Sequence, residues 1–218
     1  MKVILFGATG MVGQGVLREC LLASDVERVL SVGRSSLGQK HDKLRELLRS
    51  DLFNYSDVEA ELSGYDACFF CLGVTSAGMN ETDYRRVTVG IAAAAGRTLA
   101  RLNPGMTFVF VSGAGTDADS RTMWSRVKAE GENAIFALPF KATYAFRPAF
   151  IRPMHGIRSK TFLYRVLYAV FRPLFPVIAA LFPKHVLTTE QVGRAMLNAV
   201  RHKPPKRVLE SEDIAALA

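Results

Sequence analysis

Residues 2–13 read Lys2-Val-Ile-Leu-Phe-Gly-Ala-Thr-Gly-Met-Val-Gly13, an apolar run that leads directly into glycines at positions 7, 10 and 13. Apolar side chains with helical spacing follow at Val12, Val16, Leu17 and Leu21. A strand, a glycine turn and a helix in this order are typical of a dinucleotide-binding site, where the helix N-terminus donates N–H groups to phosphates. We expect Gly7 to permit the tight turn, Gly10 to let the backbone approach a pyrophosphate, and Gly13 to let the helix pack on the strand. A turn required only for packing is the alternative.

Length and composition favour one compact domain over residues 1–218. The chain is 49% hydrophobic, which is enough for one sizeable core. Its net charge of +8 suits an anionic ligand, a membrane surface or nucleic acid, although a solvated basic surface is the simpler explanation. The positive charges are spread in pairs without a zinc-finger, RNA-binding or helix-turn-helix signature, so we do not expect nucleic-acid binding.

The three cysteines are Cys20, Cys68 and Cys71, and the last two lie in the apolar run 67–72. Because no second ligand pair accompanies this C-x-x-C spacing, we predict a buried strand in a reduced cytosol and no metal site. The N-terminal apolar run is shorter than a signal peptide. These features predict a cytoplasmic protein.

Apolar runs alternate with helical patterns along the chain. Strands are expected at residues 2–6, 28–32, 66–72, 107–111, 143–147 and 206–209, and helices at 11–23, 81–102, 123–138 and 190–201. This alternation predicts an α/β fold, a doubly wound parallel sheet of the Rossmann kind with helices on both faces. Residues 44–51 have helical periodicity, but the βαβ topology requires a third strand there, and we predict a strand that ends near Asp51. Ser56-Asp-Val-Glu59 and Thr188-Thr-Glu-Gln191 have the pattern of capping boxes and predict two helix starts.

The second expected strand ends in Leu30-Ser-Val-Gly-Arg34, about twenty residues after the glycine turn. Sites that prefer NAD usually place Asp or Glu here to bind the ribose 2′-hydroxyl. Because an arginine can instead pair with a 2′-phosphate, Arg34 predicts NADP (NADPH) as the cofactor, with NAD less favoured. A surface arginine in a turn is the alternative.

Six short motifs occur in a characteristic order: Gly7-Ala-Thr-Gly10-Met-Val-Gly13, Val32-Gly33-Arg34, Cys71-Leu72-Gly73, Val111-Ser112-Gly113, Lys128 and Arg147-Pro148. In this order they resemble the short-chain dehydrogenase/reductase superfamily. More narrowly, the chain looks like the small atypical members grouped with the human Tat-interacting oxidoreductase-like protein. The resemblance covers nearly the whole chain and is most specific over residues 2–153.

The resemblance implies a cofactor site assembled from several loops. Its residues would be Gly7, Ala8, Thr9, Gly10, Met11, Val12 and Gly13 in the glycine turn, Arg34 at the ribose, Asp51 and Leu52 beside the adenine, Cys71, Leu72 and Gly73 along the ribose and pyrophosphate, Ser112 and Lys128, and Arg147 and Pro148 at the nicotinamide. Each residue also has an ordinary packing explanation. Their order along the chain is what favours the site.

The catalytic set departs from the superfamily pattern at one position. Members typically use a serine that orients the substrate, a tyrosine that exchanges a proton, and a lysine that holds the nicotinamide ribose. Ser112 and Lys128 match, but Trp124 occupies the tyrosine position four residues before Lys128. An indole N–H does not titrate in the useful range, and losing a general acid typically costs about 10² to 10⁴ in rate.

Two residues leave alternatives open. His155, in the loop Arg152-Pro-Met-His155-Gly, is the best substitute proton donor, although a solvated loop histidine is the more ordinary explanation. Lys128 can bind ribose hydroxyls without the tyrosine, or be a solvated lysine.

Residues 161–184 are very apolar but are interrupted by Arg165, Arg172, Pro173 and Pro176. A membrane-spanning helix needs about 20 predominantly apolar residues, so we do not expect this segment to span a bilayer. We assign residues 152–190 to a helical apolar lid or small C-terminal substrate-side lobe. Peripheral contact with an anionic membrane and a homo-oligomer contact through 161–184 are the alternatives.

Two functions from different classes follow. The first is an NADP(H)-dependent oxidoreductase acting on a small apolar carbonyl or hydroxyl compound, with Ser112, Lys128 and Trp124 at the reaction site. The second is a non-catalytic NADP(H)-binding regulatory or scaffold protein, favoured by Trp124. A nucleotide-sugar epimerase is a weaker option because its substrate lobe is usually larger.

Overall fold

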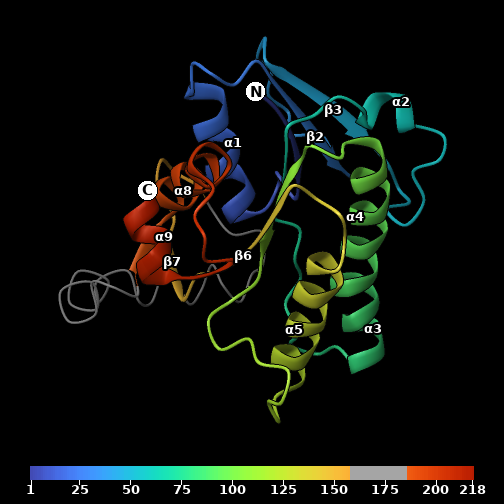
Figure 1. The fold of residues 1–218 in the computed structure, drawn as a ribbon, viewed down its shortest axis with the longest axis vertical. Helices are drawn as coiled ribbons and strands as arrows, with labels where there is room; N and C mark the ends of the chain where they lie inside the picture. Colours follow the sequence, from blue (N-terminus) through green and yellow to red (C-terminus); the bar gives the residue numbers. More distant parts are fainter. Residues whose placement is uncertain (158–185) are drawn as a thin grey trace.

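A seven-stranded parallel sheet organises the computed structural model, which describes residues 1–157 and 186–218 (Figure 1). The strand order is β3-β2-β1-β4-β5-β6-β9, and each neighbouring pair is parallel. The strands are β1 Lys2–Phe6, β2 Arg28–Gly33, β3 Leu44–Leu48, β4 Ala67–Phe70, β5 Thr107–Val111, β6 Ala142–Arg147 and β9 Val208–Glu210. The predicted doubly wound sheet is confirmed, including the third strand that the topology required, although this strand ends at Leu48 and not near Asp51.

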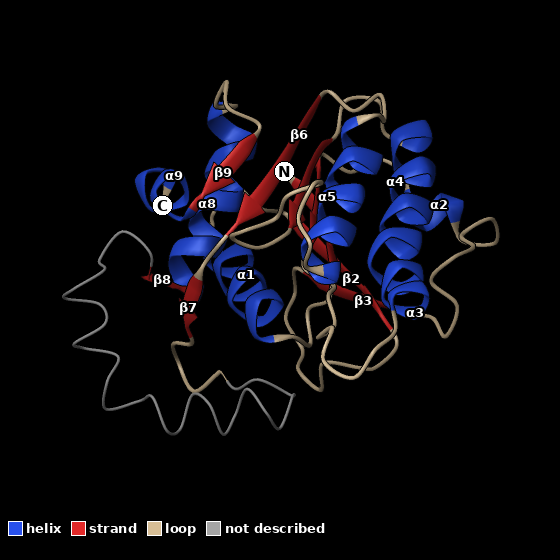
Figure 2. Ribbon diagram, turned by 90° about the horizontal axis from the view of Figure 1, so that it is seen from below, coloured by secondary structure: helices blue, strands red, loops and turns tan. Residues whose placement is uncertain are grey.

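Helices cover both faces of this sheet (Figures 1 and 2). On one face lie α1 Met11–Leu22, α8 Thr189–His202 and α9 Ser211–Leu217. On the other lie α3 Glu81–Arg85, a π-helical turn η1 Arg86–Gly90, α4 Ile91–Leu102 and α5 Met123–Phe136, with the short α2 Glu59–Leu62 beside α4. The helix predicted over 81–102 is therefore continuous but contains a π-turn.

Alternation along the strands divides the core into two layers. All four residues of β4 are fully buried; Phe69 packs in the layer of α1 and α8, whereas Phe70 packs in the layer of α4 and α5. The Phe70 ring centroid lies 5.9 Å from that of Phe108 and 5.2 Å from that of Phe6. Because a central parallel strand has no solvated face, a continuous apolar run is the pattern such a strand requires.

Small residues let α1 and α8 approach closely. A Cβ on Gly15 would lie 2.6 Å from the Thr189 Cβ, and a Cβ on Gly193 would lie 2.6 Å from the Glu19 Cγ. Both distances are too short for real atoms, so the α1–α8 contact requires glycine at these two positions.

The two predicted capping boxes have different outcomes. At α8 the Thr188 hydroxyl accepts the Gln191 N–H at 3.1 Å and the Gln191 side chain accepts the Thr188 N–H at 2.8 Å, so this box is confirmed. The box at Ser56 is wrong, because α2 begins at Glu59 with Val58 as its N-cap and without a side-chain cap. Glu59 instead pairs with Arg101.

A second, two-stranded parallel sheet joins β7 Phe150–Arg152 to β8 Val186–Thr188. The segment 152–190, predicted to be a helical lobe, thus carries strands at both ends. The apolar stretch 161–184 lies outside the described residues. Among the helices of residues 1–157 and 186–218, none is long and apolar enough to cross a membrane.

Candidate functional site

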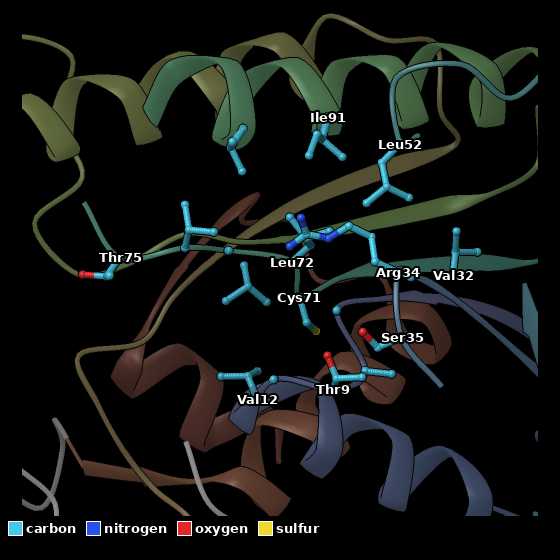
Figure 3. Close-up of a pocket in the computed structure, with 18 of the residues that line it drawn as sticks. Thr9, Val12, Val32, Arg34, Ser35, Leu52, Cys71, Leu72, Thr75 and Ile91 are labelled. Atoms are coloured by element: carbon cyan, nitrogen blue, oxygen red, sulfur yellow. The ribbon is translucent and has the colours of Figure 1, made fainter. Parts of the chain in front are cut away.

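The order in which strands are added to the sheet switches sides between β1 and β4. β2 and β3 are added on one side of this point, and β5 and β6 on the other. In open parallel sheets, ligands bind in the crevice at the carboxyl ends of strands at such a switch point. A pocket with a volume of about 1090 Å³ lies there, drawn in Figure 3. Its walls come from the glycine turn and from the segments that follow β2, β3, β4 and β5, together with α3, η1 and α5.

The glycine turn forms the floor of the pocket. Gly7 has φ +78°, and a Cβ there would lie 2.6 Å from the Leu72 nitrogen, so both the backbone angle and the space demand glycine. A Cβ on Gly13 would lie 2.1 Å from the Gly7 oxygen, which confirms Gly13 as the residue that lets α1 pack on the turn. Gly10 donates its N–H to the Gly7 oxygen at 2.9 Å.

The N-terminus of α1 faces this pocket. Gly10 is the N-cap, with extended backbone and without a side chain that could cap the first turn. The first N–H groups of a helix have no partner within the helix, and the helix dipole is positive at this end. Met11 and Val12 line the pocket, and the first turn carries no acidic side chain. The turn therefore presents a cradle for an anionic group, with no side chain in the way at Gly10.

One end of the pocket is basic. Arg34 follows β2 and, in Figure 3, its side chain points into the pocket beside Leu52 and Leu72. It is exposed and has no ion-pair partner among the described residues. Ser35 and Ser50 add hydroxyl groups. A guanidinium and hydroxyl groups are the kinds of side chain that bind phosphates.

Asp51 and Leu52, both expected beside the adenine, have different roles in the structure. Leu52 is buried and lines the pocket, whereas Asp51 is not among the lining residues. The Asp51 carboxylate accepts the Phe53 N–H at 2.8 Å and so shapes the loop after β3. Asp51 orders this wall of the pocket without forming part of it.

Ser112 and Lys128 lie at the other end of the pocket. The Ser112 hydroxyl lies 3.0 Å from the Thr116 hydroxyl. The Thr116 hydroxyl donates to the Gly113 carbonyl oxygen at 2.7 Å. Because the Thr116 proton is used there, Ser112 donates to Thr116 and keeps lone pairs with which to accept a hydrogen bond from a ligand.

The Lys128 amine sits in an apolar wall of the pocket. Its Nζ donates to the Val111 carbonyl at 3.3 Å and lies 5.5 Å from the Phe110 ring centroid. Burial lowers the pKa of Lys128 to about 8, and the nearby Glu132 carboxylate opposes this shift. The amine therefore changes protonation close to neutral pH, which an exposed lysine does not do.

Trp124 does not join Ser112 and Lys128 in the pocket lining. Its ring lies 3.5 Å from where a Cβ on Gly115 would be, so the indole packs on the loop after β5. The neighbouring Ser125 ties the same loop down, donating to the Gly115 carbonyl at 2.6 Å and accepting the Asp117 N–H at 2.9 Å. The start of α5 thus positions the loop that carries Ser112.

Arg147 and Pro148, expected beside the nicotinamide, lie outside the pocket lining. Arg147 forms a bidentate pair with the buried Glu132 of α5, at 2.7 and 2.9 Å, and lies 3.4 Å from Glu210. The Pro148 carbonyl accepts the Ala114 N–H at 3.1 Å. Because the Arg147 guanidinium is committed to two carboxylates, its role in the structure is to join β6 to α5 and β9.

His155 also lies away from the pocket. It has φ +55° and pairs with Glu190 at the start of α8. This interaction fixes the loop after β7 and leaves Lys128 as the titratable cation beside Ser112 in the lining that the structure describes.

The three cysteines are free thiols. Burial raises the pKa values of Cys20, Cys68 and Cys71, so all three are protonated and weakly reactive at neutral pH. Cys71 lines the pocket, which its place after β4 predicted.

Several lining residues were not foreseen, among them Ser31, Phe53, Thr75, Met79, Asp83 and Arg86. A position directly after an expected strand is a usable signal, and it could have identified Phe53 and Thr75. Arg86 lies inside a helix in the sequence, and only the packing of α3 and η1 on the pocket brings it there.

The turn and the sheet define a class: a Rossmann protein with the fold of the short-chain dehydrogenases/reductases. An oxidoreductase of that family from Burkholderia thailandensis superposes with a TM-score of 0.69 at 15% identity, over 100% of this chain and 93% of that one. MoeE5, solved in complex with UDP-glucose and NAD, superposes with a TM-score of 0.72 at 17% identity, over 96% of this chain and 75% of that one.

Among curated proteins the chain is similar to the mitochondrial protein FMP52-2 of Scheffersomyces stipitis. The two are 31% identical over 150 residues, which span 67% of this chain and 65% of that protein. No protein-family model matches the chain. The prediction of a cytoplasmic protein is wrong by this comparison, because this relative and further FMP52 proteins are named as mitochondrial.

Proposed function

We propose that the chain binds a nicotinamide dinucleotide across the sheet crevice and uses it as an oxidoreductase. The observation that carries the proposal is a single pocket in which a glycine cradle connects a basic end, at Arg34, to an end that holds Ser112 and Lys128. The cradle fits a pyrophosphate because Gly10 leaves space at the N-terminus of α1.

Within that proposal, Arg34 favours NADPH. The Arg34 guanidinium, which has no ion-pair partner in the described ranges 1–157 and 186–218, would bind a 2′-phosphate in a charge-assisted pair. Structural neighbours solved with NAD favour the other cofactor, so the comparison of NADPH with NADH decides the preference.

The residues at the opposite end support chemistry on a carbonyl or hydroxyl group. The cofactor would supply a hydride there. Ser112 would accept a hydrogen bond from a substrate hydroxyl through its free lone pairs, or turn its proton from Thr116 to a substrate carbonyl oxygen. Lys128 would hold ribose hydroxyls. Trp124 cannot donate the proton that a tyrosine would, so the proton comes from water or from the Lys128 ammonium. The apolar side chains of Val12, Val74 and Met79 favour a small apolar substrate.

A second function, a non-catalytic NADP(H)-binding protein, is favoured by Trp124 alone. In this alternative the cofactor stabilises the fold and exposes a surface for a partner. Peripheral membrane contact or self-association through 161–184 belongs to this alternative.

Calorimetric titration of the purified protein with NADPH and NADH tests the cofactor proposal. We expect NADPH to bind more tightly by about 1.5 to 3 kcal/mol, the range for a charged hydrogen bond. That difference corresponds to about ten- to a hundredfold in Kd, and Arg34→Glu should abolish it. Arg97→Glu, on the exposed surface of α4 outside the pocket lining, is the matched control. Absence of binding by either cofactor would overturn the proposed function.

A further inference from the structure

Phe53 lines the pocket although much of its ring is in solvent. It is 40% exposed, whereas the preceding Leu52 is 3% exposed. The loop holds it in place, because the Phe53 N–H donates to the Asp51 carboxylate and the buried Tyr55 donates its hydroxyl to the Leu52 carbonyl at 2.8 Å. An aromatic face is therefore presented at the rim of the pocket on an ordered loop.

The Arg86 guanidinium lies over this ring. Its Cζ lies 5.3 Å from the Phe53 ring centroid, and it lines the same pocket. Among the described residues it has no carboxylate partner, unlike Arg85, which pairs with Glu81 and Glu130 at 2.7 Å. Its guanidinium contacts the Phe53 ring instead.

The π-turn sets this arrangement. Arg86 opens η1 and Gly90 closes it, so both belong to one widened turn that faces the loop after β3. A Cβ on Gly90 would lie 3.0 Å from the Phe53 Cε1, which means that a larger residue would crowd the ring. Single π-turns inside α-helices occur frequently at functional sites.

Apolar side chains also line the pocket. Figure 3 shows Leu52, after β3, and Ile91, at the start of α4, on the same side of the pocket, close to where Arg34 enters. Such side chains offer an apolar surface to a flat, uncharged aromatic group, and guanidinium and aromatic faces both stack on nucleobases.

We infer that Phe53 and Arg86, which contact each other, form one joint stacking surface, here called the clamp, for the base of the bound nucleotide, independent of the contact that Arg34 makes with the ribose. The inference rests on the proposed dinucleotide binding. Phe53 and Arg86 are positioning residues that hold the adenosine half of the ligand and touch no reacting atom. Their contribution is the same for NADH and NADPH, because the two cofactors carry the same base.

Calorimetric titration of Phe53→Ala and Arg86→Ala with NADPH, NADH and adenosine 2′,5′-bisphosphate tests the clamp. Each substitution should weaken all three ligands by about tenfold, the lower part of the range for base–aromatic stacking. The ratio of NADPH to NADH affinity should not change, whereas Arg34→Glu changes that ratio. Phe53→Leu, which keeps apolar bulk without an aromatic face, and Arg86→Lys, which keeps charge without a planar group, should behave like the alanine variants.

Phe150→Ala and Arg97→Ala are the matched controls, an exposed phenylalanine and an exposed arginine outside the pocket lining. Both should bind like the parent protein, and far-UV circular dichroism should show that all variants are folded. Parent-like binding of Phe53→Leu and Arg86→Lys would overturn the clamp but leave the dinucleotide site intact. A selective loss of NADPH in Arg86→Ala would assign Arg86 to the 2′-phosphate and overturn its role on the base. If the parent protein binds none of the three ligands, the proposed function and the clamp fail together.

Discussion

At the scale of single residues, Trp124 is the position that bears on whether this site is catalytic or only binds a cofactor. Its indole packs against the loop at Gly115, outside the lining that contains Ser112 and Lys128. Trp124 therefore acts as a packing residue for the loop that carries Ser112, at a position where the superfamily pattern places its acid.

Restoring a tyrosine at this position tests whether reductase chemistry is limited by the missing acid. Because position 124 packs on the Gly115 loop outside the pocket lining, Trp124→Tyr should raise NADPH-dependent turnover of generic aldehydes and ketones by less than the roughly 10² to 10⁴ typical of a positioned general acid. Trp124→Phe should give no gain, because it supplies a ring without a hydroxyl. A loss of activity in Trp124→Tyr would mean that Trp124 belongs to a different reaction site.

Lys128 should titrate near neutral pH. Competitive labelling with trace acetic anhydride over a pH series, read by peptide mass spectrometry, should give a half-point near its pKa of about 8, with the exposed Lys40 as reference. Since the folded pKa lies below the ordinary value of 10.5, the folded state holds this proton less well, and the contribution of Lys128 to stability should rise as pH increases from about 8 to 10.5. Labelling of Lys128 and Lys40 with the same pH dependence would contradict this assignment.

At the scale of elements, helix termini and glycines decide which local predictions survive folding. The capping box at Thr188 is formed, whereas Ser56 starts no helix. The difference is contextual: α8 runs 14 residues and packs on α1 through Gly193, whereas α2 has only four residues. A local pattern becomes a helix when an adjacent surface buries its apolar side.

Thr188→Ala should lower the free energy of unfolding by about 0.5 to 2 kcal/mol, the usual cost of losing an N-cap side chain. Ser56→Ala is the matched control, and its effect should stay within about 0.5 kcal/mol, as for an exposed site without a cap. Urea denaturation of both variants beside the parent protein measures the difference. Equal effects at the two sites would show that the Thr188 cap contributes nothing specific.

At the scale of the whole molecule, the pocket joins segments that belong to both halves of the sheet. The glycine turn and Arg34 come from the half containing β1 to β3, and Ser112 and Lys128 come from β5 and α5. A ligand that bridges the two ends binds only the folded arrangement. Binding should therefore stabilise the entire domain.

This coupling predicts a concentration-dependent thermal midpoint. At a free NADPH concentration of about 100 times Kd, the free energy of unfolding should increase by about 2.7 kcal/mol. Thermal unfolding followed by circular dichroism across a NADPH series measures this increase, and Arg34→Glu should need a higher concentration for the same shift. A midpoint independent of NADPH concentration would argue against binding to the native state.

The sequence by itself determined the parallel sheet and the glycine floor of its pocket. Continuous apolar runs are needed for strands buried on both faces, and Gly7 and Gly13 occupy positions where any side chain would collide with backbone. The placement of Ser112 in this pocket followed from strand order, because the carboxyl ends of parallel strands meet at one edge of the sheet, and Lys128 reaches the pocket from the helix α5 that comes after β5.

Tertiary structure alone decided which polar side chains remain available to a ligand. Arg147 has a place in the motif order, yet Glu132 and Glu210 engage it, and His155 pairs with Glu190. Arg86 carries no signal in a one-dimensional pattern, but the π-turn and the loop after β3 bring it over Phe53. The physical reason is that a charged group binds whichever partner the folded chain places within a few ångströms, and those partners lie 15 to 63 residues away along the sequence.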